Sequence, residues 1–171
     1  MASRSRLLLG VAACFPLLGA ACDEQALPGT LLGTYTVDAQ SQTNSCGLDA
    51  PNPWQFDVQM SQDGELLYWS WMDGTPAVSA PLSGSVATLL ASQQANVDGV
   101  DGGLGPCNME RDDTLQVTLG SGSPPSTFTG TIAYAFSVTA GSDCSDQLGS
   151  AGGQYAQLPC TVTYAASGTR Q

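Results

Sequence analysis

The chain has 171 residues, of which 15 are acidic and 4 are arginine, with no lysine and no histidine. This composition excludes nucleic-acid binding and electrostatic docking on anionic headgroups, because both need clusters of Lys and Arg. It also excludes Ser-His-Asp, Cys-His, Ser-Lys and Schiff-base catalysis. Carboxylates are the catalytic groups that remain, and they lie mainly in turns or on polar strand faces. We therefore expect no enzymatic activity and no cofactor.

The first 21 residues have the pattern of a secretory signal peptide. Arg4 and Arg6 give a positive start, residues 7–18 form an apolar run, and small residues lead up to Cys22. The apolar run is too short to span a bilayer as a mature transmembrane helix. We therefore expect residues 1–21 to be removed on export.

With small residues directly before Cys22, this leader resembles a bacterial lipoprotein signal, in which a peptidase cuts before the cysteine and its thiol receives diacylglycerol. The resemblance, to the small lipoproteins of high-GC Gram-negative bacteria, implies lipidation at Cys22 and a tether over residues 22–30. It also implies a place in the cell envelope, on the periplasmic side or the cell surface, with the lipid anchor as the only membrane contact. Gly19 stands where the family prefers a large aliphatic residue. Ordinary cleavage after Ala21 and lipidation of Cys14 are the two alternatives.

The mature chain is predicted to form a single domain over residues 31–168. Residues 33–39 alternate apolar and polar side chains, and so do residues 54–60, which indicates two half-buried strands. Asp63-Gly64 is a hairpin signal, and residues 66–72 return as the partner strand. That strand carries large apolar side chains on both faces, so we expect it to be buried on both. An exposed aromatic strip that serves as a contact surface is the alternative.

The second half of the chain shows the same alternation between turn signals. Residues 77–97 predict one or two weak strands, residues 115–119 and 127–138 two clearer ones, and residues 161–164 a last one. The segment 96–103, rich in Asp and Gly, has the oxygen ligands that calcium prefers but not the EF-hand spacing. We interpret it as an acidic turn and expect no metal site.

These elements predict an all-β fold, an antiparallel meander of about 7–9 strands. Such a meander closes into an up-and-down barrel or folds into a two-layer sandwich, and we favour the barrel. Gly33 and Tyr35 resemble the Gly-x-Trp start of lipocalin-like barrels, which agrees with this choice.

Cysteine count supports export. Loss of Cys14 with the leader and lipidation of Cys22 leave four cysteines, an even number that suits disulfides in an oxidising compartment. The chain has no CxxC pair and no histidine, so zinc binding is disfavoured. The four are Cys46, Cys107, Cys144 and Cys160.

We predict the pairing Cys144–Cys160 and Cys46–Cys107. The first pair flanks one loop between successive strands, so the hairpin return should bring the two residues together. The second pair lies just outside strands at one end of the sheet. Pairing of Cys107 with Cys160 is the alternative.

Two functions remain for such a domain. One is a structural or protein-interaction module of the envelope, and the other is a carrier that holds a small apolar ligand inside the barrel. The aromatic side chains suffice to fill a small barrel, so we favour the interaction module. These side chains are Tyr35, Trp54, Phe56, Phe128, Tyr134 and Phe136.

Overall fold

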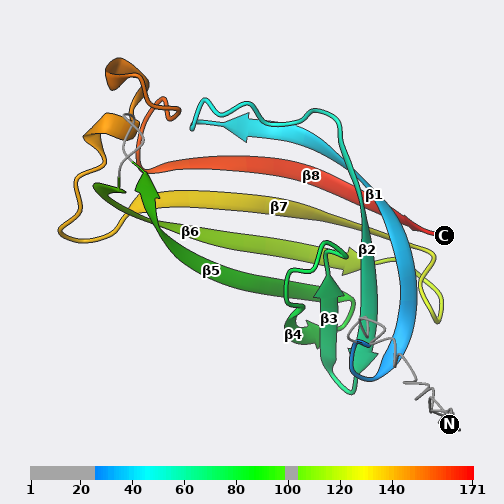
Figure 1. Cartoon of the computed structure of the whole chain (residues 1–171). Coiled ribbons are helices and arrows are strands. Elements are labelled where there is room, and N and C mark those ends of the chain that lie inside the picture. Colours follow the sequence, from blue (N-terminus) through cyan, green and yellow to red (C-terminus); the bar gives the residue numbers. More distant parts are fainter. Residues whose placement is uncertain (1–25, 99–103) are drawn as a thin grey trace, which may run out of the picture.

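The structure, a computed structural model, describes residues 26–98 and 104–171. The predicted signal peptide, Cys14 and the predicted lipidation site Cys22 lie outside the described residues. The described chain is all-β and forms a closed, antiparallel, up-and-down barrel of eight strands (Figure 1). The predicted barrel is therefore confirmed.

The strands follow one another around the barrel in chain order, and β8 pairs with β1 to close it. Two short 3-10 helices, η1 and η2, lie between β7 and β8. The elements are β1 (Thr30–Asn44), β2 (Trp54–Asp63), β3 (Leu66–Ser70), β4 (Val78–Ser83), β5 (Val86–Asp98), β6 (Leu104–Leu119), β7 (Thr127–Val138), η1 (Ser145–Gln147), η2 (Gly149–Ala151) and β8 (Cys160–Arg170).

The core lies inside the barrel and is built from the apolar row of each strand. Alternation in β1 and β2 places every second side chain inward, as the sequence predicts. Removing this apolar surface from water is the main favourable contribution to folding. The largest fully buried side chains include Trp69, Tyr35, Phe128, Met60, Leu67, Leu89 and Ile132.

The apolar strand β3 differs from the prediction of two buried faces. Leu67 and Trp69 point into the core and are fully buried, whereas Tyr68 is only half-buried, and Met72, just after the strand, is 44% exposed. The reason is that a barrel has a single wall, whose outer face meets solvent unless another element covers it.

One end of the barrel is plugged by the loop between β6 and β7. Pro125 of this loop is buried, and the hydroxyl of Tyr35 donates a hydrogen bond to its carbonyl oxygen at 2.7 Å. The guanidinium of Arg170 donates to the carbonyl of Pro124 at 3.2 Å. We call this end, where the β2–β3 and β4–β5 hairpins also lie, the closed end.

The wall is incomplete toward the opposite end, because the strands differ in length. β3 and β4 have 5 and 6 residues, whereas β5 and β6 have 13 and 16. The long strands therefore continue as a curved trough beyond β3 and β4 (Figure 1). β2 pairs with β3 only from Gln59 onward, and β4 pairs with β5 only at residues 86 and 87 of β5. We call the gap in the wall between residues 54–58 of β2 and 88–98 of β5 the split.

All four predicted cysteines form disulfides, but the predicted pairing is wrong. The structure joins Cys46 to Cys160, with 4.9 Å between their Cα atoms, and Cys107 to Cys144, with 4.5 Å. The first bridge follows from barrel closure: Asn44 of β1 lies opposite Val162 of β8, and two further steps along each strand bring Cys46 to Cys160.

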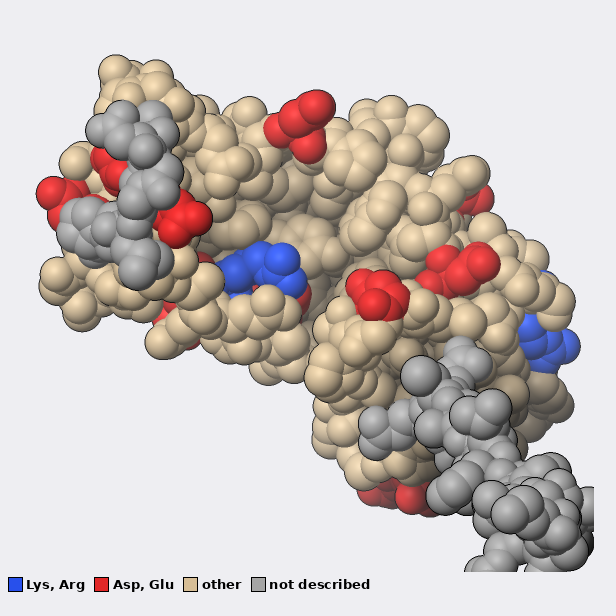
Figure 2. All heavy atoms as spheres, viewed as in Figure 1, with Lys and Arg blue, Asp and Glu red and all other residues tan. Residues whose placement is uncertain are grey.

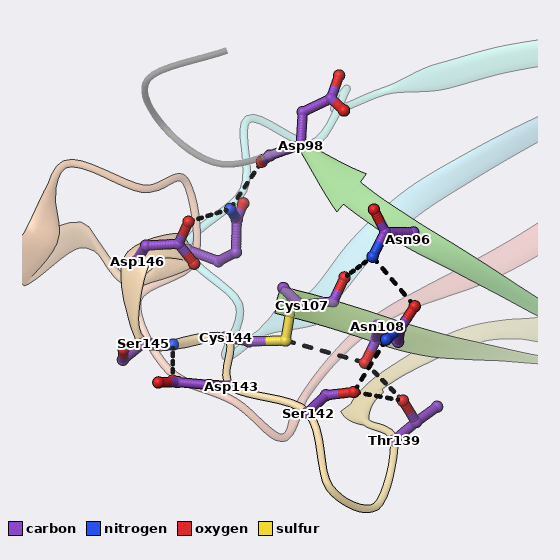
Figure 3. The surroundings of a disulfide bond; sticks show 11 residues. Asn96, Asp98, Cys107, Asn108, Thr139, Ser142, Asp143, Cys144, Ser145 and Asp146 are labelled. Atoms are coloured by element: carbon purple, nitrogen blue, oxygen red, sulfur yellow. Dashed lines mark hydrogen bonds between the residues drawn. A yellow bond between two sulfur atoms is a disulfide. The ribbon is translucent and has the colours of Figure 1, made fainter. Parts of the chain in front are cut away.

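The second bridge fastens the β7–β8 loop to the start of β6 (Figure 3). After β7, the N–H and the hydroxyl of Thr139 both donate to the carbonyl of Asn108, at 3.0 and 2.9 Å. Ser142 accepts a hydrogen bond from the Asn108 amide at 3.2 Å. These bonds turn the loop back onto β6, so Cys144 reaches Cys107 and not Cys160.

Two disulfides in a small β-barrel domain indicate folding in an oxidising, extracytoplasmic compartment. Within the part of the chain that the structure describes, no helix combines the length and the apolar character needed to cross a membrane.

Candidate functional site

A pocket of about 440 Å³ opens where the wall is split. Its lining comes from β2, the β3–β4 link, β5, β6 and β7, so residues distant in the sequence meet there. Figure 2 shows this face of the molecule hollowed, with a cationic side chain visible at the bottom of the hollow. The side chains that give the pocket its chemistry are Trp54, Trp71, Asp73, Gln93, Arg111 and Tyr134.

An ion pair lies on the inner face of β6. Arg111 and Asp113 share the inward row of this strand with Leu115 and Val117, which are buried in the core. This pair was not predicted from the sequence, because charged residues on strands were interpreted as solvent-facing. The period-2 spacing back from Leu115 was the signal that could have found it.

The ion pair is bidentate. Nε and Nη2 of Arg111 each donate to one carboxylate oxygen of Asp113 at 2.8 Å. The Arg111 guanidinium also lies over the ring of Tyr134, with its Cζ atom 5.3 Å from the ring centroid. Asp113 occupies two of the five guanidinium donors, so Arg111 is held in place and keeps donors for a bound group.

Aromatic rings form the floor beside this pair. The rings of Trp54 and Trp71 are nearly parallel, with 13° between their planes and 6.2 Å between their centroids. Phe56 packs on Trp54 at 4.3 Å, and Tyr164 lies at 5.4 Å from it. Trp54, Phe56, Trp71 and Tyr134 are only half-buried. Aromatic surface left partly open in a concave site is typical of a binding surface.

The link between β3 and β4 forms one rim of the pocket. It turns through Met72, whose φ of 58° is unusual for a residue with a side chain. The N–H of Thr75 donates to the Asp73 carboxylate at 2.9 Å, and the hydrogen bonds from Thr75 lower the pKa of Asp73. Asp73 is therefore a fixed negative charge at the rim.

The charge balance of the pocket favours a neutral or cationic partner. Asp73 and Asp113 face one cation, Arg111, among the lining residues. After removal of residues 1–21, Arg111 and Arg170 stand against fifteen acidic residues, a side-chain net charge of −13. A field of this sign repels anions at long range.

Ionisation of Tyr134 is disfavoured in the folded state. Burial raises the pKa of its phenol most, and the Asp113 carboxylate raises it further. Below about pH 10 the phenol is neutral in both the folded and the unfolded chain, so stability is unaffected. Above that pH the unfolded chain releases the proton more readily, and stability falls by at most about 1.4 kcal/mol per pH unit.

We therefore expect Tyr134→Phe to reduce the loss of stability between about pH 9 and pH 11. Denaturant unfolding of both proteins at the two pH values measures this loss. An equal loss in the variant would contradict the shift at Tyr134, because the other buried tyrosines would then account for all of it.

The predicted acidic turn at residues 96–103 is described only in part. The carbonyl of Asp98 accepts a hydrogen bond from the Gln147 amide at 3.0 Å, and residues 99–103 lie outside the described residues. Across residues 26–98 and 104–171, no group of three or more His, Cys, Asp or Glu side chains is placed to hold a metal ion.

No match was found when the chain was compared with models of protein families, with curated proteins and with solved structures. The geometry of the site is therefore the basis for assigning a function.

Proposed function

We propose that the protein is a lipid-anchored, extracytoplasmic, non-catalytic interaction module of the bacterial envelope, and that the split is its binding site. One observation carries this proposal: the inward-facing aromatic cluster and the Arg111–Asp113 pair are left open to solvent where the barrel wall is missing. Without the split, these side chains would lie inside a closed barrel, where a macromolecular partner has no access.

The interior supports an interaction module over a small-ligand carrier. Tyr35, Trp69 and Phe128 fill the closed part of the barrel and are at most 1% exposed. A carrier encloses most of its ligand in a cavity of about 300–1,000 Å³. The pocket of about 440 Å³ has a volume in this range, but it lies at an opening in the wall and not inside the closed barrel, so a large partner can also reach it.

The described part of the proposed tether meets strand β1 at the closed end of the barrel. β1 begins at Thr30, opposite Gln62 of β2, directly beside the β2–β3 hairpin. Ala26, Leu27 and Pro28 line a surface pocket together with Met72 and residues 74–77 of the β3–β4 link.

A photo-crosslinking amino acid at Gln93, in the pocket, tests the binding site in the cells that make the protein. Thr129, exposed on the outer face of β7, is the matched control position. We expect a polypeptide adduct at position 93 and none at position 129. Adducts of small-molecule mass at position 93 would favour the carrier, and equal labelling at both positions would contradict a site in the split.

Lipidation at Cys22 is tested separately from the binding site. Cys22→Ser should abolish acylation and release the protein from membranes, because acyl chains provide the membrane affinity. Labelled fatty acid and membrane fractionation measure both effects, with Cys14→Ser as the control that should leave them unchanged. Continued acylation of the Cys22→Ser protein would show that another residue carries the lipid.

A further inference from the structure

Within the described chain, strand β5 has a strand partner along its whole length on one side, but over only two residues on the other side. On one side it pairs with β6 from Val86 to Asp98. On the other side, among the residues that the structure describes, its partners are Leu82 and Ser83 of β4, opposite Ala87 and Val86. Beyond Ala87, β5 therefore borders the split and not another strand.

The backbone groups of alternate β5 residues point into the split. The N–H of Leu119 donates to the carbonyl of Ser85 at 2.8 Å, and the β5–β6 register is unbroken from there to Val97. In an antiparallel ladder, alternate residues bond the same neighbour, so the odd-numbered residues of β5 face β6. Past the last rung with β4, the N–H and C=O groups that face the split belong to Leu90, Ser92 and Gln94.

A proline explains why β4 does not cover this edge. The N–H of Leu82 donates to Glu65 at 2.7 Å, so the even-numbered residues of β4 bond toward β3 and the odd ones toward β5. The next rung after Ser83 and Val86 would join residue 81 to Thr88. Residue 81 is a proline, which has no N–H to donate, and the ladder ends there.

The exposed edge has none of the usual protections. Residues 89–95 contain no charged residue, no proline and no glycine, whereas natural edge strands are guarded by charges, prolines or bulges. Leu90, on the outer face of this edge, is 67% exposed. Such an edge is a template for an added strand.

The same edge borders the aromatic pocket. Ala91, Ser92 and Gln93 line the pocket together with Trp54 and Trp71. A strand added to β5 presents alternate side chains to the inner face of the trough. One of these side chains would reach the pocket while the backbone bonds the edge.

We propose that the split binds an extended polypeptide segment, neutral or basic, that adds to β5 as a further strand and places an apolar or aromatic side chain in the pocket. This inference rests on the proposed interaction function. A second copy of the chain is the less suitable occupant, because each mature copy has a side-chain net charge of −13 and like charges repel.

The test uses a labelled peptide that alternates threonine and valine around a central tyrosine, with lysine at both ends. We expect it to bind the wild-type barrel, and a version with glutamate at both ends to bind at least about tenfold more weakly. Ser92→Pro removes the N–H that faces the split without touching the β6 ladder, and should weaken binding at least about tenfold. Ser92→Ala is the matched control, because both variants lose the hydrogen bond from Ser92 Oγ to Glu110.

Amide exchange shows how the peptide binds. Protection of the Leu90 and Ser92 amides on binding supports strand addition, and failure of the lysine peptide to bind the wild type overturns it. Self-association that Ser92→Pro abolishes would make a second copy the occupant and overturn the proposed partner. If Ser92→Pro binds the peptide as Ser92→Ala does while crosslinks at position 93 persist, strand addition fails but the interaction module stands.

Discussion

Removal of the Cys46–Cys160 disulfide should lower the free energy of unfolding by about 5 kcal/mol. The bridge spans 114 residues. In the chain-entropy treatment, a cross-link that closes a loop of this length lowers the conformational entropy of the unfolded chain, which stabilises the fold by about 5 kcal/mol. The Cys46→Ala/Cys160→Ala double variant, compared with the wild type by denaturant unfolding, gives the value. Because this bridge joins the ends of the two strands that close the barrel, fraying of β1 from β8 should accompany the loss.

The second bridge is the control for the first. It spans 37 residues, so Cys107→Ala/Cys144→Ala should cost about 4 kcal/mol, the smaller of the two losses. Peptide mapping of the non-reduced wild type checks the pairing itself. A fragment joining Cys46 to Cys107, or Cys144 to Cys160, would contradict the structure.

Truncation of Trp69 should have the largest effect of any single change in the core. This side chain is fully buried, and its ring packs edge-on against Trp71 and Phe128 at centroid distances of 5.4 Å. Loss of a buried aromatic side chain costs about 3–5 kcal/mol. We expect Trp69→Ala to lose that much in denaturant unfolding, and to fold poorly if the barrel has less stability in reserve.

Two further variants show that the stability comes from the packing of the buried Trp69 ring. Among the described residues, Trp69 Nε1 has no hydrogen-bond partner, so Trp69→Phe gives up no hydrogen bond and should cost less than Trp69→Ala. Trp71 is half-exposed, so Trp71→Ala should cost less than half as much stability while weakening binding at the split. Equal losses for Trp69→Ala and Trp71→Ala would contradict the described core.

Alternation in the sequence was enough to predict the antiparallel strands, but it left both a barrel and a sandwich open, of which the barrel was favoured. The apolar rows of β1, β2 and β7 stand out because inward positions are filled by large side chains and outward ones by Thr, Gln and Asp. β4 and β5 were harder to predict. Beyond Ala87, β5 borders solvent on one edge, and side chains such as Gln93 and Gln94 do not show which face is inward.

The disulfide pairing could not be read from neighbouring elements alone. The prediction joined cysteines flanking one loop, whereas closure of the barrel makes the first and last strands neighbours and brings Cys46 to Cys160. Pairing in a closed barrel depends on contacts between the ends of the chain, which local spacing does not contain.

The site was the least predictable part. Arg111 and Asp113 look like solvent-facing charges until they are counted back in steps of two from Leu115. The split depends on strand lengths and on Pro81, whose effect is evident only once the hydrogen-bonding direction of β4 is known. Pattern and composition predict strands, but not where a wall is left open.

Residue-by-residue amide exchange along β5 in the free protein is the most direct test of the open split. We expect slow exchange at Leu89, Ala91 and Gln93, whose N–H groups bond β6, and fast exchange at Leu90 and Ser92, whose N–H groups face the split. Equal protection at all five amides would mean that another strand already covers this edge, and would contradict the account.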